Sequence, residues 1–199
     1  MLSLQQGTVL VMLARKSISY FSATQTFLSE KPSEKFFEQK FGVFVSLHSF
    51  PKKDLRGCIG FPLPVMPLWT ACIQAAVSAA FEDSRFPPLK ASELSSIIVE
   101  VSVLSKPEEL KCGKQQLLKK IKIGKHGLIV RKGFQSGLLL PQVPAEWNWS
   151  SLHFLEQCCL KAGLPQNAWK EEDCVIETFE AQVFKEEKPE GKIIEEKLS

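Results

Sequence analysis

The sequence predicts an α/β protein of the mixed, α+β type, with a largely antiparallel sheet and flanking helices. Helical and strand patterns alternate irregularly along the chain, and a hairpin pattern lies in its second half. Some strands alternate polar and apolar residues, which argues against a purely parallel, doubly wound sheet. With 199 residues and 44 % hydrophobic content, the chain can bury a sizeable core.

The first predicted elements are a helix and two strands. Apolar residues from Leu4 to Phe21 recur at three- and four-residue steps after Ser3, a favourable N-cap residue. The run Phe41–His48 is rich in β-branched and aromatic residues and indicates a buried strand. A Pro-Lys-Lys-Asp turn follows it, and Leu55–Gly60 is the next expected strand.

An alanine-rich helix and a third strand come next. Pro67 is well placed to open a helix from Leu68 to about Phe81, and Phe86-Pro-Pro-Leu89 ends that segment. Residues 96–104 alternate in polarity with a period of two, so we expect one solvent-facing side and an antiparallel or edge location.

The second half predicts a short helix, a hairpin, a further helix and a last strand. Amphipathic spacing predicts a short helix over Lys114–Ile121, and two strands flanking a turn, His126–Arg131 and Gly137–Leu140, predict the hairpin. A serine N-cap with a Gly-x-Pro stop predicts a helix from Ser150 or Ser151 to Ala162. Alternation of polar and apolar residues predicts the last strand over Cys174–Phe184.

Residues 1–185 are therefore expected to form a single domain, and residues 186–199 a charged, disordered tail. The tail mixes Lys and Glu with one Pro and one Gly and can bury very little apolar surface. The formal charge of +3 is a mild excess that names no partner. No apolar run is long enough to cross a membrane, and the N-terminus lacks the basic start of a secretory signal, so we expect a cytoplasmic protein.

Six cysteines and three histidines show no metal-ligand spacing, and phosphate-loop, dinucleotide and hydrolase motifs are absent. We therefore expect no metal site and no cofactor. Most of the thiols, including Cys72 and Cys158 on apolar helical stretches, are expected to be small buried side chains.

The most informative local motif is Leu-Arg-Gly-Cys-Ile-Gly at residues 55–60. Gly57 and Gly60 bracket Cys58, and Arg56 precedes it by two positions. Two residues apart on a regular strand, Arg56 and Cys58 would point to the same side, where the guanidinium favours the nucleophilic thiolate. The alternative is a buried thiol, with Arg56 paired to a nearby carboxylate.

Further polar groups are candidates for the same site. Asp83 and Arg85 follow the alanine-rich helix, where Asp83 is expected either to hold Arg56 or a substrate cation, or only to fix the end of the helix. His126 and Glu146 are candidates for a base and its orienting group, provided that they meet Cys58 in space.

These residues carry a resemblance to a known family. The hexapeptide at residues 55–60 resembles the signature of the AMMECR family, and further blocks of the chain, in order over residues 4 to 185, are similar to its other blocks. Those blocks are residues 75–80, 83–86 with Pro88, 100–105, 138–143 followed by Glu146 and Trp147, 161–164, Trp169 and 179–184. Ser84 stands where members usually have Pro, which weakens only the turn prediction.

The resemblance implies a fold of two unequal, closely packed subdomains that share a groove near the signature segment. It also implies genomic association with Memo-type and radical-SAM proteins, but no established reaction. Two functional hypotheses remain: a cysteine-dependent enzyme using Cys58, and a non-catalytic module that binds a small molecule, a protein or RNA. In either case the expected binding residues are Arg56, Gly57, Gly60, Asp83, Arg85, His126 and Glu146.

Overall fold

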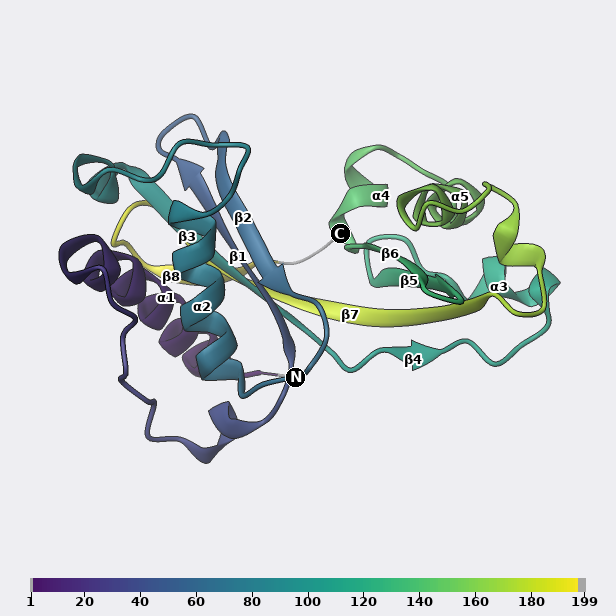
Figure 1. Cartoon of the computed structure of the whole chain (residues 1–199), viewed down its shortest axis with the longest axis horizontal. Helices are drawn as coiled ribbons and strands as arrows, with labels where there is room; N and C mark the ends of the chain where they lie inside the picture. The colour runs from purple at the N-terminus through teal and green to yellow at the C-terminus, as the bar shows by residue number, and fades with distance from the viewer. Residues whose placement is uncertain (1, 197–199) are drawn as a thin grey trace. The chain divides into compact units, whose positions relative to one another are not determined.

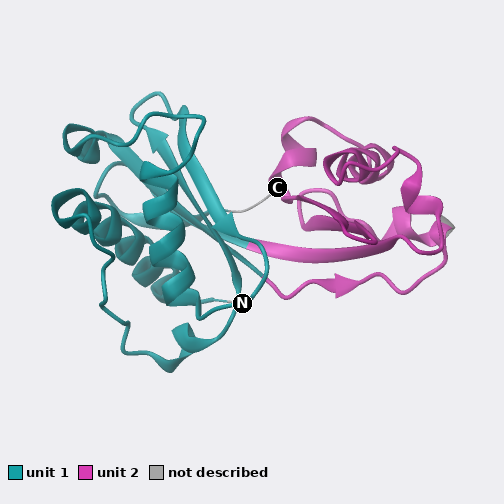
Figure 2. Cartoon of the chain, in the orientation of Figure 1, with its two compact units in different colours: residues 1–104, 182–197 teal, residues 105–181, 198–199 magenta. Residues whose placement is uncertain are grey.

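The computed structural model describes residues 2–196, apart from the side chain of Gln115, and these residues fall into two compact units (Figure 2). The first unit contains residues 2–104 and 182–196, and the second contains residues 105–181. The last long strand, β7 (Val175–Glu186), supplies residues to both. The sequence-based expectation of a mixed, largely antiparallel sheet with flanking helices is confirmed.

The first unit is built from two long helices, four whole strands, the end of a fifth strand and two 3-10 helices, labelled in Figure 1 except for the 3-10 helices. The elements are α1 (Leu4–Thr24), η1 (Lys35–Glu38), β1 (Gly42–Ser49), β2 (Leu55–Phe61), α2 (Leu68–Phe81), η2 (Ala91–Ser96), β3 (Ile97–Leu104), the end of β7, and β8 (Ile193–Glu196). Ser3 caps α1 as predicted, in a capping box with Gln6.

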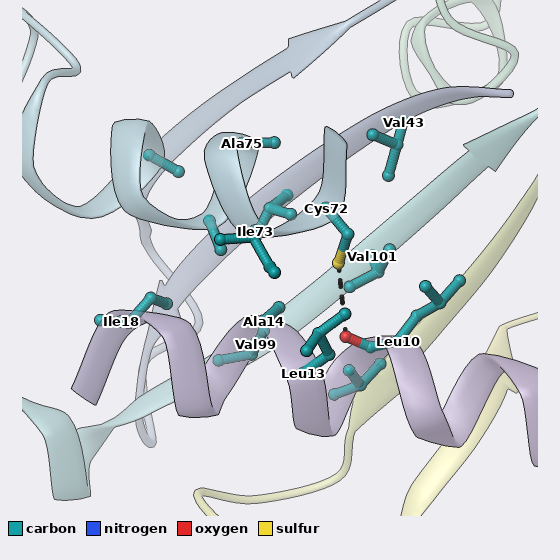
Figure 3. Packing of buried hydrophobic residues seen from close by; sticks show 14 of the residues in the cluster. Leu10, Leu13, Ala14, Ile18, Val43, Cys72, Ile73, Ala75, Val99 and Val101 are labelled. Atoms are coloured by element: carbon teal, nitrogen blue, oxygen red, sulfur yellow. Dashed lines mark hydrogen bonds between the residues drawn. The ribbon is translucent and has the colours of Figure 1, made fainter. Parts of the chain in front are cut away.

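The core of the first unit lies between these helices and the sheet. The apolar stripe of α1 and the alanine-rich face of α2 contact each other and the strands, as Figure 3 shows for Leu10, Cys72 and Val101. Small side chains on α2 permit this close approach, and the Cys72 thiol is fully buried, as predicted.

The strands of the first unit pair antiparallel, with β1 between β2 and β3. Side chains at Val43, Val45 and Leu47 are fully buried, and the intervening positions of β1 lie on the other face. One expectation for β3 is wrong. The strand has no solvent-facing side, since Ser102 is only 3 % exposed.

The second unit contains the remaining elements. They are β4 (Glu108–Glu109), α3 (Lys114–Lys120), β5 (His126–Lys132), β6 (Gln135–Leu139), α4 (Gln142–Glu146), α5 (Ser151–Lys161), η3 (Ala168–Lys170) and the start of β7. The predicted hairpin is confirmed as β5 and β6, and Ser150 caps α5. Phe154, Cys158 and Leu128 belong to a separate buried cluster. None of the helices within residues 2–196 is long and apolar enough to cross a membrane.

The expected disordered tail from residue 186 requires correction. Glu186 is the last residue of β7 and is 3 % exposed, and residues 193–196 form β8, which pairs antiparallel with β7. The carboxylate of Glu186 forms a bidentate ion pair with Arg15 of α1, with Nη2 and Oε2 2.6 Å apart, and accepts from the amide of Val99 at 2.9 Å. The charged composition of residues 186–199 suggested a solvated segment. The partners of Glu186 are 171 and 87 positions away in the sequence, so no local pattern indicates its burial. Residues 197–199 lie outside the described part of the chain.

Candidate functional site around the signature segment

The two glycines of the signature are required by close packing in the first unit. A Cβ atom at Gly57 would lie 2.1 Å from the carbonyl oxygen of Ala79 in α2, and one at Gly60 would lie 2.4 Å from the Phe44 ring. Real Cβ atoms do not approach other atoms so closely. Gly57 therefore lets β2 press directly against the backbone of α2.

Arg56 lies at an irregularity of the strand pair. Leu47 pairs with Gly57 and His48 pairs with Leu55, so Arg56 is an extra residue without a partner on β1. This interrupts the alternation that the prediction of a shared Arg56–Cys58 side required. The Arg56 guanidinium is instead held by Glu93 of η2, with Nε donating to Oε1 at 2.9 Å and Nη2 to Oε2 at 3.2 Å.

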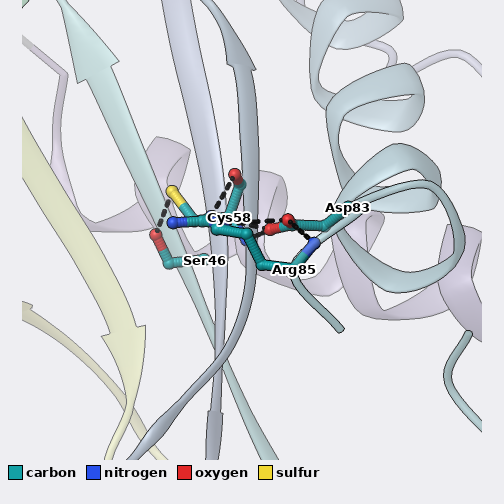
Figure 4. A network of polar contacts seen from close by, with 4 residues as sticks. All are labelled: Ser46, Cys58, Asp83 and Arg85. Carbon is teal, nitrogen blue, oxygen red and sulfur yellow. Dashed lines mark hydrogen bonds and ion pairs between the residues drawn. The ribbon is translucent and has the colours of Figure 1, made fainter. Parts of the chain in front are cut away.

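The Cys58 thiol faces Ser46, its cross-strand neighbour on β1 (Figure 4). The Ser46 hydroxyl donates to Sγ over 3.2 Å, and the thiol is partly buried. Burial raises the pKa of Cys58, against smaller opposing effects of the Ser46 hydrogen bond and the Arg85 charge. The guanidinium whose charge lowers the pKa of the Cys58 thiol is thus that of Arg85, not that of Arg56. The hydrogen-bond partner of the thiol is the Ser46 hydroxyl.

Asp83 and Arg85 form a pair that hydrogen-bonds the backbone of Cys58 on β2. Asp83 Oδ2 accepts from the Cys58 amide at 2.9 Å, and Arg85 Nη2 donates to the Cys58 carbonyl at 3.2 Å (Figure 4). Arg85 also binds Asp83 through Nε and Nη2, at 2.9 and 2.7 Å. The alternative in which Asp83 holds Arg56 is therefore wrong, because Asp83 pairs with Arg85 and Arg56 with Glu93.

The electrostatics of this pair follow from its contacts. The Arg85 guanidinium, with the amides of Cys58 and Arg85, holds the pKa of Asp83 well below its ordinary value in spite of burial. The Arg56 guanidinium likewise lowers the pKa of Glu93. Both carboxylates are ionised at neutral pH.

Three buried polar atoms at the end of the β1–β2 hairpin have no hydrogen-bond partner within the described residues. They are Arg56 Nη1, His48 Nε2 and Ser49 Oγ. His48 is the β1 partner of Leu55, and burial lowers its pKa. Because a buried unsatisfied donor costs about 1 to 3 kcal/mol, these atoms are the strongest unassigned polar groups of the site.

His126 and Glu146 belong to the second unit. His126 is the first residue of β5, its Nδ1 accepts from the amide of Lys122 at 3.3 Å, and burial lowers its pKa. Glu146 is the exposed last residue of α4. Their proposed cooperation with Cys58 stays a prediction.

Two residues of the site, Ser46 and Glu93, were not predicted from the sequence. Ser46 was within reach of prediction, because counting back through the turn of a β1–β2 hairpin places a residue of β1 opposite Cys58. Glu93 gives no such signal, since it reaches Arg56 only through the fold of η2. No group of three or more side chains able to hold a metal occurs in the part of the chain that the structure describes.

These features define a class of α+β protein in which a glycine-bracketed cysteine lies on a strand capped by a carboxylate–guanidinium pair. The chain belongs to the AMMECR1 family, whose model matches residues 11–184. The resemblance inferred from the signature is thereby confirmed.

Similar proteins occur in archaea. A protein of Methanopyrus kandleri is 50 % identical to this chain, and the match covers all of this chain and 97 % of that protein. A protein of Methanocaldococcus jannaschii is 48 % identical, and the match covers all of this chain and 98 % of that protein. The crystal structure of an uncharacterized protein from Pyrococcus horikoshii matches with a TM-score of 0.89 at 45 % identity, covering 96 % of this chain and 97 % of the other. These relatives establish the family and the fold, and leave the activity open.

Proposed function

We propose that this protein binds a ligand through its first unit. An anionic group of the ligand binds at the end of the β1–β2 hairpin, and Cys58 takes part in no covalent chemistry. The ligand class is a small molecule, or a protein side chain, that carries a carboxylate or phosphate. The observation that carries the proposal is the free Nη1 of Arg56.

The guanidinium of Arg56 is well suited to this role. Its side chain is only 14 % exposed, and Glu93 fixes its orientation through two hydrogen bonds, which leaves Nη1 as a preoriented donor. Ser49 adds an unpartnered hydroxyl in the adjoining part of β1. A bound anion would satisfy donors that the protein itself leaves unpaired.

Inorganic phosphate and citrate are suitable probes, with the midpoint of thermal unfolding as the readout. A ligand at 100 times its Kd stabilises the folded state by about 2.7 kcal/mol, or roughly 5 to 10 °C for a chain of this size. We expect such a rise for the wild type and its loss in Arg56→Lys, because lysine keeps the charge but cannot bind Glu93 and a ligand together.

The matched control is the triple variant Lys119→Gln, Lys120→Gln, Lys122→Gln, which removes positive charge from the second unit and should keep the full rise. A wild type that responds to neither probe would contradict the proposal. An undiminished rise in Arg56→Lys would do so as well.

A cysteine-dependent enzyme is the second candidate, favoured by the partial exposure of Cys58 and the nearby Arg85 charge. Alkylation by iodoacetamide across pH, followed by mass spectrometry, separates the two candidates. Since burial raises the pKa of Cys58, we expect slower labelling than in a model cysteine peptide, with a midpoint above about 8.5. Fast labelling with a midpoint near neutral pH would favour the enzyme.

A further inference from the structure

The positive charge of the chain is concentrated in one segment of the second unit. The sequence has 25 basic and 22 acidic residues, yet residues 110–145 contain eight basic residues and no Asp or Glu. The rest of the chain therefore carries an excess of negative charge. The net charge of +3 hides this separation, because it is the sum of a positive segment and a negative remainder.

Four of these basic residues form what we call the α3–β5 basic surface: Lys119, Lys120, Lys122 and Lys125. All four are exposed, and the turn that carries the last two is closed by the amides of Lys125 and His126 donating to the Lys122 carbonyl. Only Lys125 has an ion pair within the described residues, with Glu180 at 3.1 Å, and both partners are solvent-exposed.

Local structure does not account for this surface. Lys119 and Lys120 lie in the last turn of α3, where positive charge complements the helix dipole. The helix dipole does not explain Lys122 and Lys125, which follow the helix. Arg131 and Lys132 are different, because Glu177, Glu171 and Asp173 neutralise them.

An exposed aromatic ring follows α4 in the same unit. Trp147 is 69 % exposed, while Trp149, two residues later, packs against the buried cluster. The backbone is anchored nearby, since the hydroxyl of Ser151 donates to the carbonyl of Ile121 at 3.2 Å, directly before Lys122. Trp147 is four positions before Ser151 in the sequence, so the Cα atoms of the two residues lie within about 14 Å of each other.

We infer that the α3–β5 basic surface and Trp147 bind single-stranded nucleic acid. Lysine ammonium groups contact phosphates without regard to sequence, and an exposed indole provides a face on which an unpaired base stacks. A duplex would hide its base faces from Trp147, and an acidic protein would offer it no base to stack on. This role lies in the second unit and does not depend on ligand binding by Arg56.

Fluorescence anisotropy with labelled oligouridine and oligothymidine of about 12 nucleotides tests the inference on the full chain. With about four phosphate contacts, the affinity should fall about 50-fold between roughly 50 and 200 mM salt. In Lys119→Gln/Lys120→Gln/Lys122→Gln the fall should shrink to about 3-fold. Trp147→Ala should weaken binding about 5-fold or more at constant salt.

The control variant, Lys35→Gln/Lys40→Gln/Lys52→Gln, removes the same charge from exposed positions of the first unit and should bind as the wild type does. Circular dichroism should show that all variants remain folded. Oligouridine and oligothymidine separate RNA from DNA, and tighter binding of either supports the inference.

Three results would overturn it. The first is no salt-dependent binding in the wild type, and the second is equal loss of binding in the two triple lysine variants. The third is binding of polyglutamate as tightly as oligonucleotide with no effect of Trp147→Ala, which would make the surface a site for acidic proteins.

Discussion

At the residue scale, Arg56 and Cys58 show how one extra residue changes a site. A regular strand would place both side chains on one side, where the guanidinium would activate the thiol. The register shift opposite Leu47 and His48 interrupts that alternation, so Arg56 binds Glu93 while Cys58 contacts Ser46. The signature predicted that Arg56 and Cys58 belong to the site, whereas the irregularity at Arg56 decides which partners the two side chains contact.

Gly57 provides a test at this scale. In Gly57→Ala the new methyl group would lie 2.1 Å from the Ala79 carbonyl oxygen, and backbone cannot move away as a side chain can. We expect a loss of about 1 to 3 kcal/mol, or more, in the free energy of unfolding, measured by urea denaturation. Gly113→Ala is the matched control, because nothing lies within 4 Å of its Cβ position and the change should stay below about 1 kcal/mol. Equal effects of the two substitutions would refute the packing argument.

At the scale of elements, the loop after α2 protects strand β2. Cys58 would otherwise present an unpaired amide and carbonyl, which is a liability at the edge of a sheet. Asp83 accepts from the amide and Arg85 donates to the carbonyl, so a side-chain pair replaces a neighbouring strand. A structural role for this pair at the end of the helix was expected from the sequence, whereas its role on β2 was not.

The stability that this pair provides should depend on pH. Because the pKa of Asp83 is lowered by folding, its contribution is fully present above the unfolded value of about 3.9 and is lost as the pH falls through the folded pKa. Asp83→Asn should therefore cost about 1 to 3 kcal/mol at neutral pH. Urea unfolding at about pH 3 should show a smaller difference from wild type. A difference that does not change with pH would show that the carboxylate charge contributes nothing.

At the scale of the whole molecule, the first unit is discontinuous in sequence. Its helices and first three strands come from residues before 105, and its remaining strands come from the end of the chain. Arg15 and Glu186, 171 residues apart, join these two parts through a buried ion pair. Residues 182–196 are therefore part of the fold of the first unit.

Substitution of two adjacent glutamates tests this closure. Glu186→Ala leaves Arg15, which is 13 % exposed, without its carboxylate, and should lower the free energy of unfolding by about 3 to 5 kcal/mol. Glu187→Ala changes an exposed residue and should alter it by less than about 0.5 kcal/mol. Chemical denaturation of both variants measures the difference. If the two variants are equally stable, the ion pair does not hold the end of the chain.

The family, the fold class and most of the helices and strands were predictable from local sequence patterns, because periodicity, capping residues and turn residues act over a few neighbours. The pairing of Arg56 with Glu93, the pairing of Asp83 with Arg85 on β2 and the burial of Glu186 became evident only from the folded chain. It also showed that the lysines after α3 are exposed while Arg131 and Lys132 are paired. The physical reason is that partner choice and burial depend on contacts between residues as far apart as 37 and 171 positions, which local patterns do not encode.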